Sequence, residues 1–464
     1  MELILLIGNK CNMILNRKSI QFTIFIFDVF FLFLSLFCAL FLRNLSIPSF
    51  DVYISHFYLF LPEFIFWEIL MYTMNLYSID HNVLNFKILY RLFITFIIST
   101  LIGFSTFYLF SKHYTPKTVL IIQNTVSFII IYLWHSLSRS LFSNNLTHAN
   151  YIFIGNNYTV TEIIELSKTR MLGNFTPKAI YDENNTETTK LPCIKNFEEF
   201  KSFCKDNNIN IYVLSPNYAL SQEMSTFLFD KLNDKAVYYS LPDFFELIAR
   251  KIPLGAINDY WILSNTSYHG KIIYKFFKRI SDILIALLLT PISIILFPII
   301  ALIIKLESKG PVFFVQKRLG LNGKVFNLYK FRTMRTENNN FAYTVENDNR
   351  ITKFGKIMRK MRIDELPQVI NILKGDMSLI GPRPERPELA VDLQKEIPYY
   401  NQRLIVKPGI TGWDQASGEY HSPSVEDTYK KLQNDLYYVK NQGFALDFSI
   451  FFKTIRTVFA REGQ

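Results

Sequence analysis

Long apolar stretches constrain the fold of this chain more than any other feature of its sequence. Four of them, rich in phenylalanine, lie near residues 20–42, 53–77, 86–110 and 117–138. An α-helix of about 20 residues crosses the ~30 Å of hydrocarbon in a bilayer. Each stretch is therefore predicted to form a transmembrane helix, and a single soluble enzyme core is disfavoured.

Basic residues beside these stretches predict an orientation in the membrane. Lys10, Arg17 and Lys18 precede the first stretch, and Arg139 follows the fourth. Because Lys and Arg concentrate in cytoplasmic loops, both ends of this region are expected on the cytoplasmic side. Residues 1–145 are thus predicted to be a four-helix transmembrane region, without a cleaved signal peptide.

The composition narrows the class of protein further. Half of the 464 residues are hydrophobic and the formal net charge is +11, which together exclude a disordered chain. The four cysteines are scattered, without the paired spacing of a zinc site, and are predicted to be reduced thiols without a chemical role. They are Cys11, Cys38, Cys193 and Cys204.

Residues 150–250 have the pattern of a small doubly wound domain. Strand-like runs near 151–155, 178–181, 209–215 and 235–241 alternate with helical runs, which predicts a parallel sheet covered by helices. The turn after the first run has Gly155 but lacks the other two glycines of a Gly-x-Gly-x-x-Gly dinucleotide site. A Rossmann-like domain without strong nucleotide binding is expected, serving as a scaffold or interaction domain.

A fifth apolar stretch follows a predicted linker at 251–270. Its residues 283–304 carry no charge and are numerous enough to span a bilayer, but Pro291 and Pro298 interrupt the run. A fifth span would place the basic C-terminal part outside the cell. We therefore favour a re-entrant helix over about 275–306 that breaks at Thr290-Pro291 and returns to the same face, with a fifth span as the alternative.

The last third of the chain is basic and carries an acidic pair. Residues 316–362 contain 12 Lys and Arg against three acids, which predicts a polyanionic ligand. The position behind a membrane segment favours a phosphorylated small molecule or lipid head group over nucleic acid. Asp364 and Glu365 follow this basic stretch. Asp364 is predicted to be the N-cap of a helix. The two carboxylates could also hold Mg²⁺, and one of them could attack a phosphorus atom.

Five motifs in this part resemble those of the bacterial sugar transferases, the polyprenyl-phosphate hexose-1-phosphate transferases or monotopic phosphoglycosyl transferases. They are Gly-Pro-Val-Phe-Phe-Val-Gln at 310–316, Lys-Phe-Arg-Thr-Met at 330–334, Arg-Ile-Asp-Glu-Leu-Pro-Gln at 362–368, Lys-Gly-Asp-Met-Ser-Leu-Ile-Gly-Pro-Arg-Pro-Glu at 374–385 and Lys-Pro-Gly-Ile-Thr-Gly-Trp at 407–413. The resemblance covers 271–464 and implies an α/β catalytic domain anchored by the re-entrant helix. The whole chain resembles long-form members that begin capsule, exopolysaccharide or O-antigen synthesis at the bacterial inner membrane, with both soluble domains cytoplasmic.

The resemblance also implies a reaction. Asp364 would attack the β-phosphate of a UDP-sugar and release UMP, and undecaprenyl phosphate would then accept the phosphosugar. Glu365 would act as a metal ligand or acid/base, with Mg²⁺ held by both carboxylates. The family pattern assigns substrate binding to Lys330, Arg332, Arg359, Arg383, Pro382 and Pro384, and the helix break to Thr290 and Pro291.

One departure from the family bears on the sugar. Many members read Ala-Gln-Val-Asn after the tryptophan, where this chain has Asp414-Gln415-Ala416-Ser417. The carboxylate of Asp414 could alter the sugar accepted, or it could lie in an exposed loop without effect. The sequence leaves the sugar, the pathway and a homo-oligomeric state open.

Two alternatives belong to other classes of protein. A non-catalytic regulatory protein of polysaccharide export is disfavoured because the Asp364-Glu365 pair is intact. A transporter is disfavoured because the spans lack Gly/Pro-interrupted repeats. The acids Asp28, Glu63 and Glu68, which fall in or near the spans, are instead expected to be satisfied by neighbouring helices.

Overall fold

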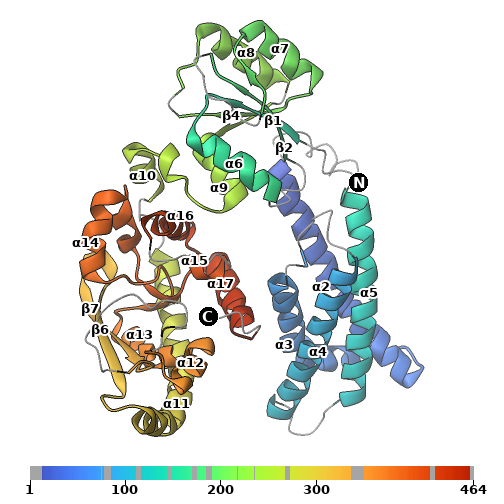
Figure 1. Cartoon of the computed structure of the whole chain (residues 1–464). Helices are drawn as coiled ribbons and strands as arrows, with labels where there is room; N and C mark the ends of the chain where they lie inside the picture. Colours follow the sequence, from blue (N-terminus) through green and yellow to red (C-terminus); the bar gives the residue numbers. More distant parts are fainter. Residues whose placement is uncertain are drawn as a thin grey trace. The chain divides into compact units, whose positions relative to one another are not determined.

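Helices dominate the structure, a computed structural model of the whole chain (Figure 1). It describes residues 13–74, 76–77, 85–110, 116–143, 149–169, 175–183, 191–216, 218–234, 236–266, 272–335, 348, 350–417 and 424–459. Lys10 and Cys11 lie outside these residues. The chain divides into two units, Met1–Asn156 with Val160–Tyr239, and Asn157–Thr159 with Ser240–Gln464.

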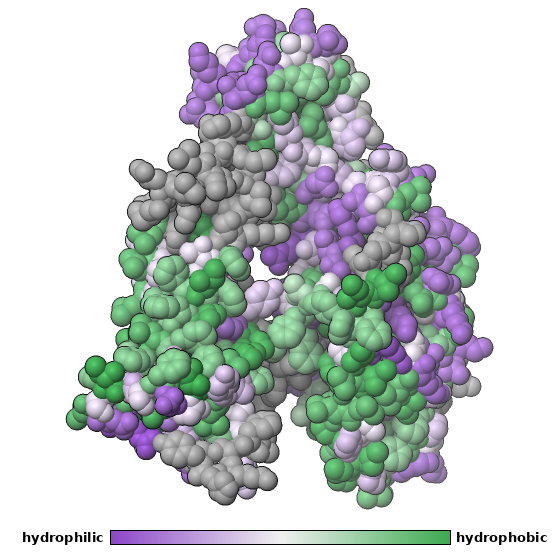
Figure 2. All heavy atoms as spheres, turned by 180° about the vertical axis from the view of Figure 1, so that it is seen from behind, coloured by the Kyte–Doolittle hydropathy of each residue, from purple (hydrophilic) through white to green (hydrophobic). Residues whose placement is uncertain are grey.

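The N-terminal region is built from long helices. They are α2 (Met13–Asn44), α3 (Phe50–Thr73), α4 (Asn85–Phe110) and α5 (Lys117–Ser143). Together with a later helix, α11 (Ile272–Glu307), they are the five helices among the described residues that are long and apolar enough to cross a membrane. Many large apolar side chains of these helices are exposed, and hydrophobic residues cover much of the lower part of the face seen in Figure 2.

The acids inside this bundle have partners on neighbouring helices or loops. His135 Nε2 lies 2.9 Å from Asp28 Oδ2, and Tyr77 donates to Glu68 Oε2 at 2.6 Å. Glu63 accepts from the amide of Asn124. The prediction of partners on neighbouring helices thus holds for one oxygen each of Asp28 and Glu63, whereas the partner of Glu68 follows α3. The other oxygen of each carboxylate is buried without a hydrogen-bond partner among the described residues.

The middle region is a five-stranded sheet with helices beside it. Its strands are β1 (Ala149–Ile154), β2 (Phe175–Tyr181), β3 (Cys193–Ile194), β4 (Ile211–Leu214) and β5 (Val237–Ser240), in the order β3-β2-β1-β4-β5. Strand β1 pairs in parallel with β2 and β4, and β2 with β3. The helices are α6 (Tyr158–Thr169), α7 (Phe197–Asp206) and α8 (Gln222–Asn233). This is the predicted doubly wound pattern. Strand β3 was not predicted, because a strand of two residues shows no periodicity in the sequence.

The first turn of this sheet is filled by side chains of the domain itself. Gly155 has φ +86°, and an added Cβ would lie 2.6 Å from Cβ of Tyr218. The backbone N–H of Asn156 donates to Asp182 Oδ2 at 2.9 Å. Tyr218 therefore lies where a pyrophosphate approaches the backbone in a dinucleotide-binding turn.

The C-terminal unit combines short strands with many helices. Before α11 come α9 (Leu241–Ala249), η1 (Leu254–Ala256) and α10 (Asp259–Asn265). After α11 comes the antiparallel hairpin of β6 (Phe313–Leu319) and β7 (Val325–Phe331), with the turn η2 (Leu321–Gly323) between them. The parallel pair β8 (Ser378–Ile380) and β9 (Gly409–Thr411) forms a second small sheet. The other elements are α12 (Lys353–Lys360), η3 (Ile363–Gln368), α13 (Val369–Lys374), α14 (Pro387–Glu396), η4 (Tyr400–Ile405), α15 (Trp413–Ala416), α16 (Val425–Asn441) and α17 (Phe444–Phe459).

The segment predicted as a linker, 251–270, contributes to the core of this unit. Its Ile252, Leu254 and Ile262 are buried in one cluster with Leu432 and Leu436 of α16. The apolar residues of this segment are too few to show a period, so the sequence alone predicts a connection here.

Helix α11 is continuous over 36 residues, with both prolines inside it. The expected break at Thr290-Pro291 is therefore not an interruption of the helix. Thr290 Oγ1 donates to the carbonyl of Ala286 at 2.7 Å, a bond that can bend a helix without ending it. The ribbon of α11 changes direction in its lower part (Figure 1), as prolines inside a helix allow.

Both ends of α11 are attached to the unit that follows it. Near its start, Arg279 Nη1 donates to the carbonyl of Ile372 at 2.6 Å. At its end, Glu307 Oε1 accepts from the N–H of Phe354 at 3.0 Å. Between these ends many apolar side chains are exposed, Leu288 and Ile295 among them.

Candidate active site

The acidic pair lies in the 3₁₀ helix η3, between α12 and α13. Arg362 begins this helix in the left-handed conformation, with φ 56° and ψ 19°, and no side chain caps it. Asp364 lies inside the turn, so the prediction that it is an N-cap is wrong. Asp364 and Glu365 are both buried, at 8% and 6% exposed.

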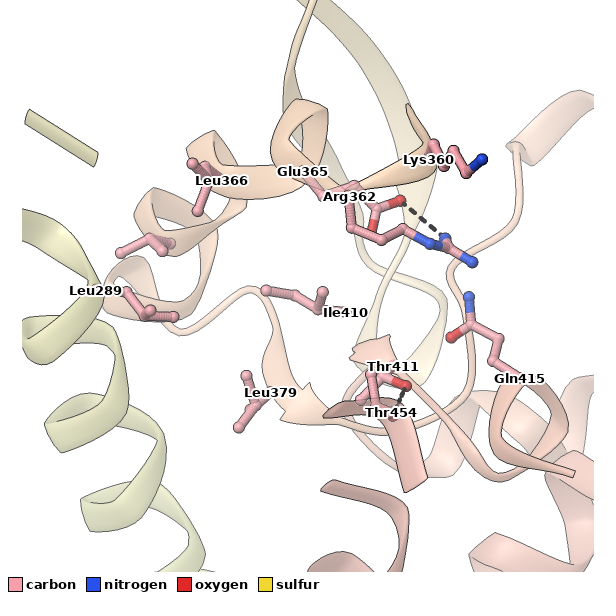
Figure 3. Close-up of a pocket in the computed structure, with 11 residues that line it drawn as sticks. Leu289, Lys360, Arg362, Glu365, Leu366, Leu379, Ile410, Thr411, Gln415 and Thr454 are labelled. Atoms are coloured by element: carbon pink, nitrogen blue, oxygen red, sulfur yellow. Dashed lines mark hydrogen bonds and ion pairs between the residues drawn. The ribbon is translucent and has the colours of Figure 1, made fainter. Parts of the chain in front are cut away.

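Three cations surround Glu365. Its Oε1 lies 2.8 Å from Lys330 Nζ on β7 and 3.1 Å from Arg383 Nη2, which follows β8. Arg362 Nη1 lies 3.7 Å from the same oxygen, as the dashed line in Figure 3 shows. Burial acts to raise the pKa of Glu365, but these three charges outweigh burial and hold the pKa well below its usual range. Glu365 is therefore an ionised carboxylate that organises the cations.

Asp364 has the opposite environment. Its Oδ1 is buried and has no hydrogen-bond partner among the described residues. Burial raises the pKa of Asp364, as does the charge of Glu365, and the cations Lys330, Arg359 and Arg362 offset only part of that rise. Such a carboxylate is poorly stabilised in its ionised form and is free to react or to bind a cation.

Arg383 is presented by a fixed backbone. Pro382 and Pro384 flank it, and both are buried. The carbonyl of Pro382 accepts from the N–H of Gly409 at 3.0 Å, and that of Pro384 from Arg318 Nη1 at 3.0 Å. Hydrogen bonds thus hold the backbone on both sides of Arg383, while the contact of Arg383 with phosphate stays a prediction.

A further pair behind Arg383 was missed by sequence reasoning. Arg403 donates from Nη2 to the carbonyl of Arg383 at 2.8 Å and lies 2.7 Å from Asp435 Oδ2. Both side chains are almost fully buried. No motif joins residues that lie 32 positions apart in different helices, so nothing in the sequence could have paired them.

Two predicted binding residues have other partners. Arg332 is 5% exposed and donates to the carbonyls of Ser308 and Lys309, at 2.7 and 2.8 Å, where α11 ends. It is not brought into the cluster around Glu365. Arg359 donates from Nε to Thr333 Oγ1 at 2.9 Å and acts on Asp364 through its charge.

A pocket of about 160 Å³ opens beside Glu365. Figure 3 shows its apolar lining at the left and centre and its polar lining at the right. The apolar residues are Leu289, Leu366, Val369, Leu379 and Ile410, and the polar ones are Lys360, Arg362, Glu365, Thr411, Gln415 and Thr454. Because Leu289 belongs to α11, the apolar side of the pocket adjoins this long apolar helix, next to Thr290 and Pro291.

Asp414 does not lie in an exposed loop. It is 8% exposed in the short helix α15, and its Oδ1 accepts from Asn434 Nδ2 at 3.0 Å. The interpretation of a solvated loop is therefore wrong. The next residue, Gln415, is the one that lines the pocket.

The carboxylates fit a magnesium ion as partial ligands. Among the described residues no group of three or more His, Cys, Asp or Glu side chains could form a metal cage. Mg²⁺ commonly uses one or two carboxylates together with water and substrate phosphates. The unpartnered Oδ1 of Asp364 beside Glu365 meets that requirement, and such an ion would neutralise charge on a phosphate.

Comparison with known proteins agrees with this chemistry. Residues 273–461 match the model of the bacterial sugar transferases. A sugar transferase of Bacillus subtilis (strain 168), EpsL, described as uncharacterized, is 42% identical over 190 residues, which cover 40% of this chain and 89% of that protein. This chain belongs to the bacterial sugar transferase family. The acidic pair, its cations and the pocket all lie within the matched part of this bacterial sugar transferase.

Longer members of the family match over the same part only. A UDP-N-acetylgalactosamine-undecaprenyl-phosphate N-acetylgalactosaminephosphotransferase of Aeromonas hydrophila is 48% identical over 188 residues, 40% of this chain and 44% of that protein. A UDP-glucose:undecaprenyl-phosphate glucose-1-phosphate transferase of Escherichia coli (strain K12) is 39% identical over 187 residues, 39% of this chain and 40% of that protein. The match thus spans less than half the length of either relative.

Proposed function

We propose that this protein transfers a sugar 1-phosphate from a UDP-sugar to undecaprenyl phosphate, through a phosphosugar covalently bound to Asp364. The observation that carries the proposal is the contrast between the two adjacent carboxylates. Glu365 is bonded to cations, whereas Asp364 keeps an unpartnered buried oxygen. The names of the relatives support the donor and acceptor classes.

The first step is an attack by Asp364. A carboxylate oxygen forms a bond to the β-phosphorus of the UDP-sugar, and the bond from that phosphorus to the bridging oxygen breaks. The bridging oxygen leaves with UMP. The sugar phosphate is then held on Asp364 as an acyl phosphate.

The second step restores the enzyme. An oxygen of undecaprenyl phosphate attacks the same phosphorus, and the bond to Asp364 breaks. The product is a lipid diphosphate sugar, and Asp364 is again a carboxylate. Lys330, Arg362 and Arg383, oriented by Glu365, lie within reach to neutralise phosphate charge in both steps.

We propose that α11 is re-entrant rather than a fifth span. The attachment of both its ends to the same unit supports this arrangement. Its exposed apolar side chains would lie in lipid, and the pocket beside Leu289 would open toward the bilayer. A soluble nucleotide sugar and a membrane-bound acceptor could then both reach Asp364.

The cellular setting follows from the same chemistry. The protein would be a multi-pass protein of the bacterial inner membrane with both soluble domains on the cytoplasmic side. Its reaction would be the first membrane step of exopolysaccharide, capsule or O-antigen synthesis, and the Rossmann-like domain would act as a scaffold. Relatives named for N-acetylgalactosamine and for glucose leave both sugars as candidate donors.

The reaction is tested by measuring UMP release from a panel of UDP-sugars by the solubilised full-length protein, with and without Mg²⁺ and undecaprenyl phosphate. We expect multiple turnovers of at least one donor that require both the ion and the lipid. Absence of UMP from every donor, with the protein folded, would favour the non-catalytic alternative. Passage of a substrate across proteoliposomes without UMP would favour a transporter.

Arg383→Ala is expected to raise the KM for the UDP-sugar about 10-fold or more, because a guanidinium that contacts phosphate is lost. Arg383→Lys keeps the charge without the planar fork and should recover only part of the affinity. Lys395→Ala, on the exposed face of α14, is the control and should leave KM unchanged. Equal KM values for all variants would remove Arg383 from the binding site.

The rate of UMP release is expected to fall as the pH is lowered. We expect this fall at a pH above the ordinary pKa range of an aspartate. Only the ionised form of Asp364 attacks, and burial raises its pKa. The charge of Arg359 lowers that pKa, so Arg359→Gln should move the acid limb to higher pH, whereas Arg359→Lys should not. If the natural protein, Arg359→Gln and Arg359→Lys all lose activity at the same acid pH, the assignment of this pH dependence to Asp364 would be contradicted.

A further inference from the structure

Gln415 is a pocket residue to which the proposed steps assign no role. Its side chain lines the pocket beside Arg362, and the two point toward the same space in Figure 3. Gln415 Oε1 is buried and lacks a hydrogen-bond partner within the described part of the chain. The hydrogen bonding of such a buried amide oxygen is satisfied when a ligand or a water molecule supplies a donor.

The chemistry of an amide identifies the part of the substrate that suits it. Lys360 and Arg362 in the same pocket are cations and match phosphate oxygens. The amide of Gln415 is neutral and both donates and accepts hydrogen bonds. It therefore matches the uncharged hydroxyl or acylamino groups of a sugar better than a phosphate.

The helix that carries Gln415 is fixed at its first residue. Trp413 is 5% exposed, and its Nε1 donates to the carbonyl of Arg250 at 3.0 Å. Its ring lies 5.4 Å from that of Tyr437, and Lys453 Nζ lies 4.3 Å from its centroid. Arg250 precedes residues 273–461, so this anchor lies outside the part matched by the family model.

The anchor is itself held on the C-terminal unit. Glu246, on the helix α9 that ends before Arg250, accepts from Lys440 Nζ at 2.7 Å. On the other side, Ile252 donates from its N–H to the carbonyl of Gln433 at 3.1 Å. Arg250 has φ 55°, and its carbonyl faces Trp413 between these two attachments.

The start of α15 also meets the segment that presents Arg383. A Cβ added to Gly412 would lie 2.5 Å from the carbonyl oxygen of Gly381. This close approach ties the position of α15 to the residues immediately before Pro382. A displacement of Trp413 would therefore change how Gln415 faces the pocket.

We infer that Gln415 contacts the sugar of the nucleotide-sugar donor, and that Trp413 positions it through the hydrogen bond to Arg250. This inference rests on the proposed function, because it assumes a UDP-sugar in the pocket. It makes Gln415 a substrate-binding residue and Trp413 a positioning residue. It also gives the segment 240–266 a part in substrate binding.

The test compares the binding of UDP-sugars with that of UDP. The full-length protein with Asp364→Asn, which should bind without reacting, is titrated with UDP-N-acetylgalactosamine, UDP-glucose and UDP. Adding Gln415→Ala is expected to weaken the better-bound sugar nucleotide about 10-fold and to leave the Kd of UDP unchanged, since UDP lacks the sugar. A general loss of the fold would instead weaken the binding of all three ligands.

Trp413→Phe removes the N–H donor and keeps an aromatic ring. We expect it to weaken binding of the sugar nucleotide about 3- to 10-fold, and to add nothing when Gln415 is already Ala, because it acts through Gln415. Trp134→Phe on α5, outside the segment 240–266 and outside the pocket, is the matched control and should bind as the parent does.

Two results would overturn the inference. One is an equal affinity for the sugar nucleotides with and without Gln415→Ala, and the other is additive effects of the Gln415 and Trp413 changes. Failure of the proposed function has a different signature, because the protein with Asp364 intact would then bind the sugar nucleotide without releasing UMP.

Discussion

Asp364→Asn is expected to lower the rate of UMP release by more than about 10³-fold, because the amide has no electron pair of carboxylate basicity to attack phosphorus. The fold should survive the change. Burial raises the pKa of Asp364, which means that folding disfavours its charge, so the neutral amide should leave the midpoint of thermal unfolding equal or slightly higher. UMP release and thermal unfolding measure the two effects separately.

Asp392→Asn provides a matched control for this prediction. Asp392 is an exposed residue of α14 that pairs with Lys395 at 3.4 Å, away from the acidic pair. The same chemical change there should leave UMP release intact. Full turnover by the Asp364→Asn protein would end the covalent account, and loss of activity in both variants would show that the assay reports folding.

Glu365→Gln is expected to reduce both stability and activity. The carboxylate compensates Lys330, Arg362 and Arg383, and removing one partner of a buried charge cluster typically costs about 3–5 kcal/mol. The cations would also lose their orientation toward the phosphates, so UMP release should fall about 100-fold or more. Chemical denaturation at pH 7 and UMP release measure the two losses.

The pH dependence of this stability loss has a definite sign. The pKa of Glu365 is depressed in the folded protein, so its contribution is complete above the ordinary glutamate pKa and is lost as pH falls toward the depressed value. The difference between the natural protein and Glu365→Gln should therefore shrink under acid conditions. Glu388→Gln, at an exposed position of α14, should change neither quantity at any pH. An unfolding free energy unaffected by Glu365→Gln would contradict the charge cluster.

The helices and the acidic pair could be predicted because their signals are local. Apolar runs near 20–42 and 117–138 correspond to α2 and α5, since length and hydropathy alone decide such segments. The alternation of strands and helices predicted the parallel sheet for the same reason. The pair Asp364-Glu365 was found because it is contiguous in the sequence and lies inside a family motif.

The position of Arg332 away from Glu365 has a simple physical cause. Lys330 and Arg332 are two residues apart, and in a continuing strand they would share one face. Strand β7 ends at Phe331, so Arg332 leaves the sheet and turns to the carbonyls at the end of α11. The motif at 330–334 placed both residues together but did not show that a strand ends between them.

Other features depend on contacts between distant segments and could not be predicted. Asp414 accepts a hydrogen bond from Asn434 on α16, and Trp413 is anchored by a carbonyl 163 positions earlier. Neither partner belongs to a motif or a periodic pattern. The pocket beside Glu365 likewise exists only after α11, η3 and α15 have come together.

The central claim is that a phosphosugar is carried on Asp364, and the most direct test is the mass of the protein after a single reaction with its UDP-sugar and Mg²⁺ in the absence of undecaprenyl phosphate. We predict one added phosphosugar per chain on the peptide that contains Asp364, released UMP in equal amount, and loss of the added mass when the lipid phosphate is supplied. UMP that appears only when the lipid is present, with no added mass at any time, would show direct transfer and contradict the account.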